Sequence, residues 1–430
     1  MKQSIKIIIV KIKNKVKEYP ELRSKLISLL NYFPNIKILI KGLTSKSLDY
    51  SSLKPSATKK ELLVDVSDVH KEDLKTGIQR VVRSILYYLE LQTILDLDVQ
   101  PVYLTDEDGY WCYKYVKSPK IIVVPKKGDI FLGLDLNKDI HAIGKNSLLK
   151  DYKARGLEMV FVVYDILPIQ YPQFCREDAT ILHTLWLDTI LKYSSKLICI
   201  SKAVSDDVAQ YIEAHKDEFS TTPTVECFHL GADIENSQPT KGIPSDADEL
   251  LQKLSTTSSF LMVGTIEPRK GHKQTLEAFE RLWSDDKDVA LVIVGKKGWM
   301  MDDFAKKLKK HPKLNKKLFY LDGISDEYLD MIYKSCSCLL VASEAEGFGL
   351  PLIEAAQYKK PIIARDITVF REVAGKFAYY FNNTNSPLEI EQTIDTWLEL
   401  YKEDKHPKSN NMPWLTWKES TMQLIQKGIL

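Results

Sequence analysis

Residues 338–357 read CLLVASEAEGFGLPLIEAAQ. The run 338–341 is uniformly apolar, which is typical of a strand buried on both faces of a parallel sheet. Gly347 and Gly349 then permit a tight loop whose backbone amides can face a ligand, and Pro351 suits the first turn of a helix. A strand, a glycine loop and a helix in this order form the repeating unit of a doubly wound α/β domain, whose ligands bind beyond the carboxyl ends of the strands.

The same alternation of apolar strands and helices extends over most of the chain. The predicted strands are 62–66, 99–104, 130–134, 159–164, 197–200 and 225–228, and then 260–263, 289–294, 318–321, 338–341 and 361–364. A stretch rich in Ser, Thr and Asp, residues 237–259, separates the two groups. The sequence therefore predicts two Rossmann-like domains, 61–235 and 236–410, that face a ligand cleft. We expect the remaining residues, 411–430, to form a helix that packs back on the first domain.

The first 60 residues are strongly basic. They hold 14 Lys or Arg against three acids, a charge of +11 that leaves −9 on the rest of the chain. Apolar residues at helical spacing predict two amphipathic helices within residues 1–45, broken near Pro20, and residues 46–60 are expected to be a linker. Such helices can lie on an anionic membrane surface or pack on the body as an arm. Nucleic acid is disfavoured as a partner, because aromatic residues are not interleaved with the charges.

Composition and motifs exclude several other classes of protein. No apolar run approaches the ~18 residues of a membrane helix, and no signal peptide is recognisable. The six cysteines lack metal-ligand spacing, and Asp96-Leu97-Asp98 is interpreted as surface charge, so no metal site is expected. A G-x-G-x-x-G motif after the first strand of either domain is absent, which counts against a nicotinamide-dependent dehydrogenase. We expect a cytoplasmic protein, held at the inner face of the membrane if its leader binds lipid.

The second domain contains a candidate anion site. Its first strand ends at Gly264, and Arg269 and Lys270 follow just before the next helix. A glycine lets the backbone approach a ligand closely, the helix N-terminus adds positive potential, and an arginine can bind two phosphate oxygens. These residues predict a site for phosphate groups.

Two carboxylates flank the glycine loop. Glu346 precedes Gly347, and Glu354 lies eight residues further along, on the helix. A carboxylate on such a helix can accept both hydroxyls of a ribose, and one on the loop can reach a sugar or stabilise developing positive charge.

These motifs resemble those of the retaining glycosyltransferases of the GT-B group, family 4. The resemblance covers residues 61–430 and rests on Gly264 followed by Pro-Arg-Lys-Gly, and on Glu-Gly-Phe-Gly-Leu-Pro-x-x-Glu at residues 346–354. It implies that Arg269 and Lys270 bind the donor diphosphate and that Glu354 binds the ribose. It further implies that Glu346 and the backbone of Phe348, Gly349 and Leu350 hold the donor sugar and phosphate. Segments beginning at Gly295 and containing Gly323 would border the base.

The first domain offers candidate acceptor residues. Thr76 and Gly77 stand where similar enzymes have a glycine loop near the acceptor. The strand 159–164 ends in Tyr164-Asp165 before Ile-Leu-Pro, which resembles a His-Asp or Tyr-Asp pair of the family. Asp165 is the candidate for holding a sugar or acceptor hydroxyl, and His183 is expected to be a packed histidine.

The function predicted is that of a hexosyltransferase acting in the synthesis of a bacterial surface polysaccharide or lipopolysaccharide. Its catalytic residues would be Asp165, Arg269, Lys270 and Glu346. The resemblance favours GDP-mannose as donor, with a UDP- or dTDP-sugar as alternative, and a saccharide or lipid-linked acceptor. No cofactor or essential metal is expected beyond the nucleotide-sugar co-substrate. A sugar-nucleotide epimerase and a non-catalytic binding subunit are the rival functions.

Overall fold

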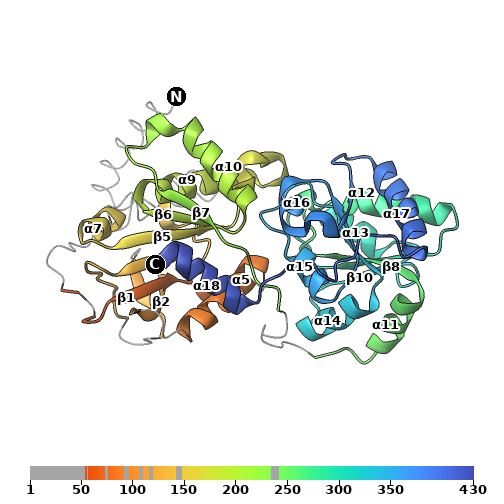
Figure 1. The fold of residues 1–430 in the computed structure, drawn as a ribbon, viewed down its shortest axis with the longest axis horizontal. Coiled ribbons are helices and arrows are strands. Elements are labelled where there is room, and N and C mark those ends of the chain that lie inside the picture. The colour runs from red at the N-terminus through yellow and green to blue at the C-terminus, as the bar shows by residue number, and fades with distance from the viewer. Residues whose placement is uncertain are drawn as a thin grey trace, which may run out of the picture.

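Two α/β lobes lie side by side in the computed structural model (Figure 1). The structure describes residues 54–430 except 56, 73–75, 92–95, 106–109, 116–119, 142–147 and 234–241. The predicted leader helices lie outside these residues, as does most of the predicted linker. In the described part of the chain, every helix is too short or too polar to cross a bilayer.

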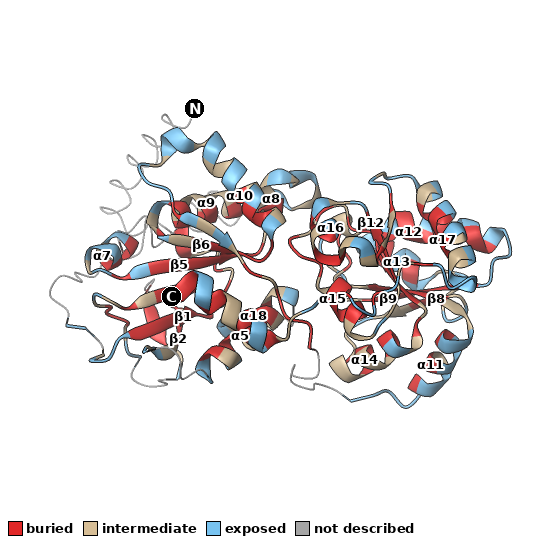
Figure 2. Ribbon diagram, in the orientation of Figure 1, coloured by how far each residue is buried: buried red, intermediate tan, exposed pale blue. Residues whose placement is uncertain are grey.

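The N-terminal lobe is built on a seven-stranded sheet of order β3-β2-β1-β4-β5-β6-β7, in which only β3 runs antiparallel to its neighbour. Its strands are β1 (Glu61–Asp65), β2 (Asp98–Leu104), β3 (Trp111–Tyr113), β4 (Ile130–Gly133), β5 (Glu158–Val163), β6 (Lys196–Cys199) and β7 (Thr224–Cys227). The helices are α4 (Ser67–Lys71), α5 (Gly77–Glu90), α7 (Leu148–Ala154), α8 (Leu167–Gln170), α9 (Glu177–Tyr193) and α10 (Lys202–Ala214). The central strands are buried on both faces, because helices cover the sheet above and below (Figure 2).

The C-terminal lobe repeats this plan with a six-stranded, wholly parallel sheet of order β10-β9-β8-β11-β12-β13. Its strands are β8 (Ser258–Val263), β9 (Val289–Val294), β10 (Leu318–Leu321), β11 (Cys338–Val341), β12 (Ile362–Arg365) and β13 (Tyr379–Phe381). Its helices are α11 (Ala247–Thr256), α12 (His272–Ser284), α13 (Asp302–Lys309), α14 (Asp326–Ser335), α15 (Leu350–Gln357), α16 (Thr368–Ala374) and α17 (Pro387–Lys402). Helix α12 packs on α17, and α11 packs on α14.

The prediction of two doubly wound sheets is confirmed, and each of the eleven predicted strands is present to within two residues at either end. Two strands were missed, β3 and β13. Each has three residues, too few for a periodic pattern to be recognisable.

The last α-helix, α18 (Trp417–Leu424), which continues as a π-helix over Ile425–Ile429, returns to the N-terminal lobe and packs on α5 (Figure 1). Its start is fixed by the Trp417 amide, which donates to Asp233 Oδ1 over 2.6 Å. Gly231 passes so close that a Cβ there would lie 2.5 Å from the Trp417 nitrogen. Together these contacts attach the C-terminal residues to the first lobe.

We predict that Trp417→Ala costs about 3–5 kcal/mol of unfolding free energy, because it empties a buried indole site beneath α18. The side chain is 2% exposed. Urea unfolding of the full chain measures the loss. Trp414→Ala is the matched control, because Trp414 is 37% exposed and should change stability by no more than about 0.5 kcal/mol. Equal effects of the two changes would contradict this account of the packing.

Candidate active site

The glycine loop between β11 and α15 is clamped between the lobes. Gly347 lies against the carboxyl end of β5, where a Cβ would come within 2.1 Å of the Tyr164 carbonyl oxygen. The Ser201 hydroxyl, at the start of α10, donates to the Gly347 carbonyl over 2.7 Å. Gly349 has a φ of 97° and caps α15, a conformation that favours glycine. A side chain larger than hydrogen at Gly347 would therefore push the lobes apart.

Two cations and two carboxylates form a compact cluster in front of this loop. Arg269 Nη1 lies 2.8 Å from Glu346 Oε2, and Lys270 Nζ contacts Glu346 Oε1. The other side of the Arg269 guanidinium lies 3.2 Å from Glu267 Oε2, and its Nη1 also donates to the Ala345 carbonyl over 2.8 Å. The cluster joins the loop after β8 to the loop after β11. It brings together Arg269, Lys270 and Glu346, to which the family resemblance assigns the donor diphosphate and sugar.

The electrostatics of the cluster hold its charges in place. Burial by itself would raise the pKa of Glu346, but Arg269 and then Lys270 outweigh it and lower that pKa to about 2. Burial raises the pKa of Glu267, against the opposing effect of Arg269. The adjacent His272 is 2% exposed, and burial followed by the Lys270 charge lowers its pKa to about 3. At neutral pH, Glu346 is therefore ionised and His272 is neutral.

The depressed pKa of Glu346 predicts a pH-dependent contribution to stability. The ionised carboxylate is fully stabilising above its unfolded pKa of 4.5, and this contribution is lost as the pH falls toward 2. The free-energy difference between wild type and Glu346→Gln should therefore fall by roughly half between pH 5 and pH 3. Parallel urea titrations of both proteins measure this difference. A difference that stays constant over this range would contradict the pairing.

Glu354 on α15 meets a cation from the other lobe. Arg80, in the first turn of α5, places Nη1 2.7 Å from Glu354 Oε1 and Nη2 3.3 Å from Asp326 Oδ1. The Tyr333 hydroxyl, buried in α14, donates to Glu354 Oε2 over 2.7 Å. Glu354 is 3% exposed. Burial by itself would lower the pKa of Arg80, but the negative charge of Glu354 outweighs it, so the pKa of Arg80 is raised. Both carboxylate oxygens thus already have partners in this structure.

The N-terminal lobe presents Asp165 to the cluster. Asp165 follows β5, accepts the Leu167 amide over 3.1 Å, and has its Cβ 3.3 Å from the position a Gly347 Cβ would take. Tyr164 is 2% exposed and donates its hydroxyl to the Leu134 carbonyl, so only its main chain faces the loop. His183 is 1% exposed and contacts the Asp165 carbonyl through Nε2 over 3.0 Å. It packs beneath the site, as expected from its place on the helix.

Thr76 and Gly77 open α5 next to the glycine loop between β11 and α15. The Thr76 hydroxyl accepts the Gln79 amide while the Gln79 side chain accepts the Thr76 amide, which forms a reciprocal cap. A Cβ on Gly77 would lie 3.9 Å from Leu350 Cδ1, so the two predicted loops are neighbours across the lobes. Asp326, one of the partners of Arg80, begins α14 in the opposite lobe.

The remaining predicted residues line the carboxyl ends of the C-terminal sheet. Gly264, with a φ of 139°, lies beneath Lys270, and a Cβ on Gly295 would come within 1.9 Å of the Gly264 carbonyl oxygen. Gly323 has a φ of 65° and open space at its Cβ position. Phe348 is 3% exposed and packs edge-on against His229 of the other lobe.

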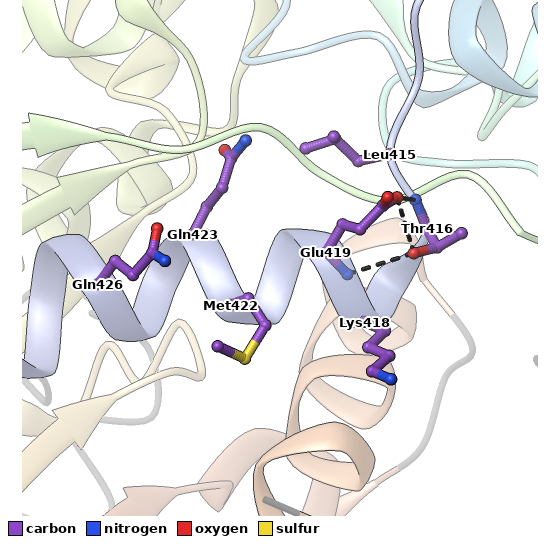
Figure 3. Close-up of a pocket in the computed structure, with 7 residues that line it drawn as sticks. All are labelled: Leu415, Thr416, Lys418, Glu419, Met422, Gln423 and Gln426. Atoms are coloured by element: carbon purple, nitrogen blue, oxygen red, sulfur yellow. Dashed lines mark hydrogen bonds between the residues drawn. The ribbon is translucent and has the colours of Figure 1, made fainter. Parts of the chain in front are cut away.

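A shallow pocket lies elsewhere, beside α18. Its lining residues are Leu415, Thr416, Lys418, Glu419, Met422, Gln423 and Gln426 (Figure 3). The Thr416 and Glu419 side chains cap one another there and so are occupied in holding the helix start. None of the predicted site residues lines this pocket, so it is not the candidate active site. Within the described residues, no three His, Cys, Asp or Glu side chains are grouped as metal ligands. Asp96 and Asp98 are exposed near the start of β2.

Sequence reasoning did not assign roles to four residues of this site. They are Arg80, Ser201, Glu267 and Tyr333. Glu267 could have been noticed, because it stands two residues from Arg269. The partners of Arg80 and Ser201 are 274 and 146 residues away, which no local pattern can reveal.

Residues 248–412, which contain this cluster, match the family model of glycosyl transferases group 1. The chain carries a group 1 glycosyl transferase domain. The likeness to known proteins extends beyond this domain. The chain is 42% identical over 380 residues to the serotype-specific mannosyltransferase WbdA of Escherichia coli, and the aligned region covers 85% of this chain and 46% of WbdA. It is also 26% identical over 224 residues to the O-antigen chain mannosyltransferase RfbU of Salmonella typhimurium, which covers 51% of this chain and 55% of RfbU. The chain thus spans about half the length of the curated relatives it matches.

Solved structures resemble the whole two-lobed architecture around the glycosyl transferase domain. Anabaena HepE in complex with UDP and glucose aligns with a TM-score of 0.59 at 14% identity, over 85% of this chain and 98% of HepE. Sucrose-phosphate synthase from Thermosynechococcus elongatus aligns with a TM-score of 0.60 at 14% identity, over 86% of this chain and 98% of that chain. These likenesses confirm the predicted GT-B fold.

Proposed function

We propose that this chain is a retaining hexosyltransferase that moves mannose from GDP-mannose to a saccharide of an O-antigen chain. The observation that carries the proposal is the cation and carboxylate cluster of Arg269, Lys270 and Glu346, set at the carboxyl ends of β8 and β11 in a glycosyl transferase domain. Relatives named as mannosyltransferases support the choice of sugar.

The donor diphosphate takes the place of protein carboxylates as partner of the two cations. Arg269 and Lys270 are neutralised here by Glu346 and Glu267, so an incoming diphosphate competes with charges already present. We infer that Glu346 turns from the cations to the hydroxyls of the donor sugar when the diphosphate arrives. The cations then stabilise the charge that develops on the leaving group, and the cluster is preorganised for that task.

The ribose binds Glu354, and the lobes part to admit it. Glu354 is buried and held by Arg80 and Tyr333, and Gly347 is covered by the main chain of the other lobe. A donor therefore reaches these groups only when the contacts between the lobes open. Closure around the bound donor would bring Asp165 to the sugar and exclude water, which favours transfer over hydrolysis.

Asp165 positions the acceptor, and the chemistry proceeds on the face from which the diphosphate leaves. In this proposal no protein carboxylate acts as a nucleophile: the acceptor oxygen bonds to the anomeric carbon as the bond from that carbon to the diphosphate breaks, and the departing phosphate accepts the proton of the acceptor hydroxyl. The protein then contributes orientation and charge neutralisation. Our proposal assigns the neutralising role to Arg269 and Lys270 without an essential metal, and unchanged transfer after treatment with EDTA would support it.

A nucleotide panel followed by a transfer assay tests the function. The full chain is heated with GDP, UDP, dTDP, ADP or NADH, and the ligand at 100 times its dissociation constant should add about 2.7 kcal/mol to stability. GDP is the expected ligand, and mannose transfer to an O-antigen saccharide with retained anomeric configuration is the expected reaction. An increase in thermal stability with UDP or dTDP alone would show that the donor carries that nucleotide instead of GDP. Release of epimerised sugar without acceptor would favour the epimerase, and no shift with any nucleotide would favour a non-catalytic subunit.

The basic leader is proposed to hold the enzyme at the inner face of the cytoplasmic membrane. This proposal rests on the charge of +11 in residues 1–60, most of which lie outside the described residues. Deletion of residues 1–45 should weaken binding to anionic vesicles, and unchanged binding would instead favour the packed-arm alternative.

A further inference from the structure

A second basic region lies on the C-terminal lobe, in residues 296–317. These 22 residues contain nine lysines and two acids, a formal charge of +7, whereas residues 61–430 as a whole carry −9. The region comprises Lys296–Met300 after β9, helix α13, and the turns that lead to β10. An anionic partner would be attracted to this region.

The helix presents its charges on one side. Phe304, Ala305 and Leu308 of α13 are buried in the lobe. Lys306, Lys309 and Lys310, spaced three and four residues apart, are exposed on the other side. Such a face is free to meet a surface while the apolar side anchors the helix.

Several of these lysines have no internal counter-charge. Lys306 pairs with Asp303, Lys307 with Glu280, and Lys317 with Asp288. Lys297 pairs with Asp302, but for Lys309, Lys310, Lys313 and Lys316 no carboxylate partner is found among the residues that the structure describes. Four unpaired ammonium groups within eight residues repel one another, so an external anion at this place would relieve the repulsion.

Two apolar side chains stand exposed directly before the helix. Met300 is 54% exposed and has a φ of 56°, a left-handed conformation that a methionine seldom adopts. Trp299 is 37% exposed and donates its indole N–H to the Phe174 carbonyl of the other lobe over 2.7 Å. The backbone thus turns an apolar side chain outward at the edge of the interface between the lobes, at a conformational cost that points to a function.

We propose that Trp299, Met300 and the four unpaired lysines, Lys309, Lys310, Lys313 and Lys316, form a docking surface for an anionic lipid bilayer. Lysines pair with lipid headgroups, and tryptophan and methionine enter the headgroup region beside them. A bilayer fits better than a nucleic acid, because Trp299 is the single exposed aromatic residue in 296–317, all of which the structure describes, and bases would lack stacking partners. Docking in this way sets the edge of the interface between the lobes against the membrane. The proposal does not depend on which reaction the chain catalyses.

The test uses the full chain and vesicles of phosphatidylethanolamine with roughly 30% phosphatidylglycerol, an anionic content that gives the vesicles a negative surface potential. The variant replaces Lys309, Lys310, Lys313 and Lys316 with glutamine. The matched control replaces four exposed lysines of the N-terminal lobe, Lys150, Lys153, Lys192 and Lys216, and so changes the net charge equally. Each lysine near an anionic surface strengthens binding about fivefold, so the contact made by this face should weaken at least about 100-fold in the variant.

The deciding readout is local to the surface, because the basic leader can also contact lipid. The fluorescence of Trp299 is obtained as the difference between wild type and the Trp299→Phe variant. Brominated phosphatidylglycerol should quench this fluorescence. This quenching should vanish in the four-lysine variant at subsaturating lipid and persist in the control. Trp299 unquenched in wild type, or quenched equally in the four-lysine variant, would overturn the proposal. Loss of binding to a short single-stranded DNA in that variant, with no Trp299 quenching by lipid, would overturn it in favour of a nucleic acid.

Discussion

Arg269→Met should lower kcat/KM for mannose transfer from GDP-mannose by at least about 1000-fold. The guanidinium faces Glu346 at 2.8 Å and is the group placed to bind the leaving diphosphate. Removing one preorganised donor to a developing oxyanion costs about 100- to 1000-fold, and Arg269 also carries a full charge. The dissociation constant of GDP, measured by calorimetry, should rise along with the loss of transfer.

The same change should destabilise the fold, and a second substitution separates the two effects. When Arg269 is removed, the carboxylates of Glu346 and Glu267 stay buried with less positive charge beside them. This loss costs about 3–5 kcal/mol of unfolding free energy. Adding Glu346→Gln removes one of these charges and should recover most of the stability in urea unfolding. GDP carries no donor sugar and so does not need Glu346, and its binding, measured by calorimetry, should not recover in the double variant. If the double variant bound GDP as tightly as wild type does, Arg269 would have a structural role alone.

Glu354→Gln should weaken GDP binding by about 100-fold or more. Hydrogen bonds from the two ribose hydroxyls to a carboxylate contribute about 1.5–3 kcal/mol each, and an amide replaces one accepting oxygen with a donor. The comparison of GDP with 2′-deoxy-GDP isolates this contact. Wild type should prefer GDP clearly, and the ratio of the two dissociation constants should approach one in the variant.

Asp326→Asn is the matched control for this prediction. Asp326 shares Arg80 with Glu354, at 3.3 Å and 2.7 Å respectively, but is not assigned to the ribose. The control should loosen the contact between the lobes and keep the preference for the ribose 2′-hydroxyl. Loss of that preference in Asp326→Asn but not in Glu354→Gln would refute the assignment of Glu354.

Local sequence patterns were sufficient to predict the architecture of the two sheets. Runs such as VALVIV in β9 are buried at every position, and their apolar character predicts a strand covered on both faces wherever it lies in the fold. The loops between these strands and the following helices could also be located, because Gly264 and Gly349 require left-handed backbone that other residues avoid. In a parallel sheet the loops that follow the strands lie at one edge, and this is where the structure places Arg269, Lys270 and Glu346.

The contacts between the lobes could not be predicted from local sequence patterns. Arg80 is 274 residues from Glu354, and its sequence neighbourhood, TGIQR, indicates only the start of a helix. Tyr164 was considered for the acceptor site, yet its ring is directed to the Leu134 carbonyl and its main-chain oxygen faces Gly347.

The sequence by itself therefore determined the two sheets, the glycine loops and the cluster of cations and carboxylate at the end of the second sheet. Those features depend on residues close in the chain and on the parallel arrangement that their periodicity imposes. Only the tertiary structure decided that Arg80 pairs with Glu354 and that Ser201 and the Tyr164 carbonyl cover Gly347. These contacts depend on how two independently folded surfaces fit together, and a single sequence records no local periodicity for that fit.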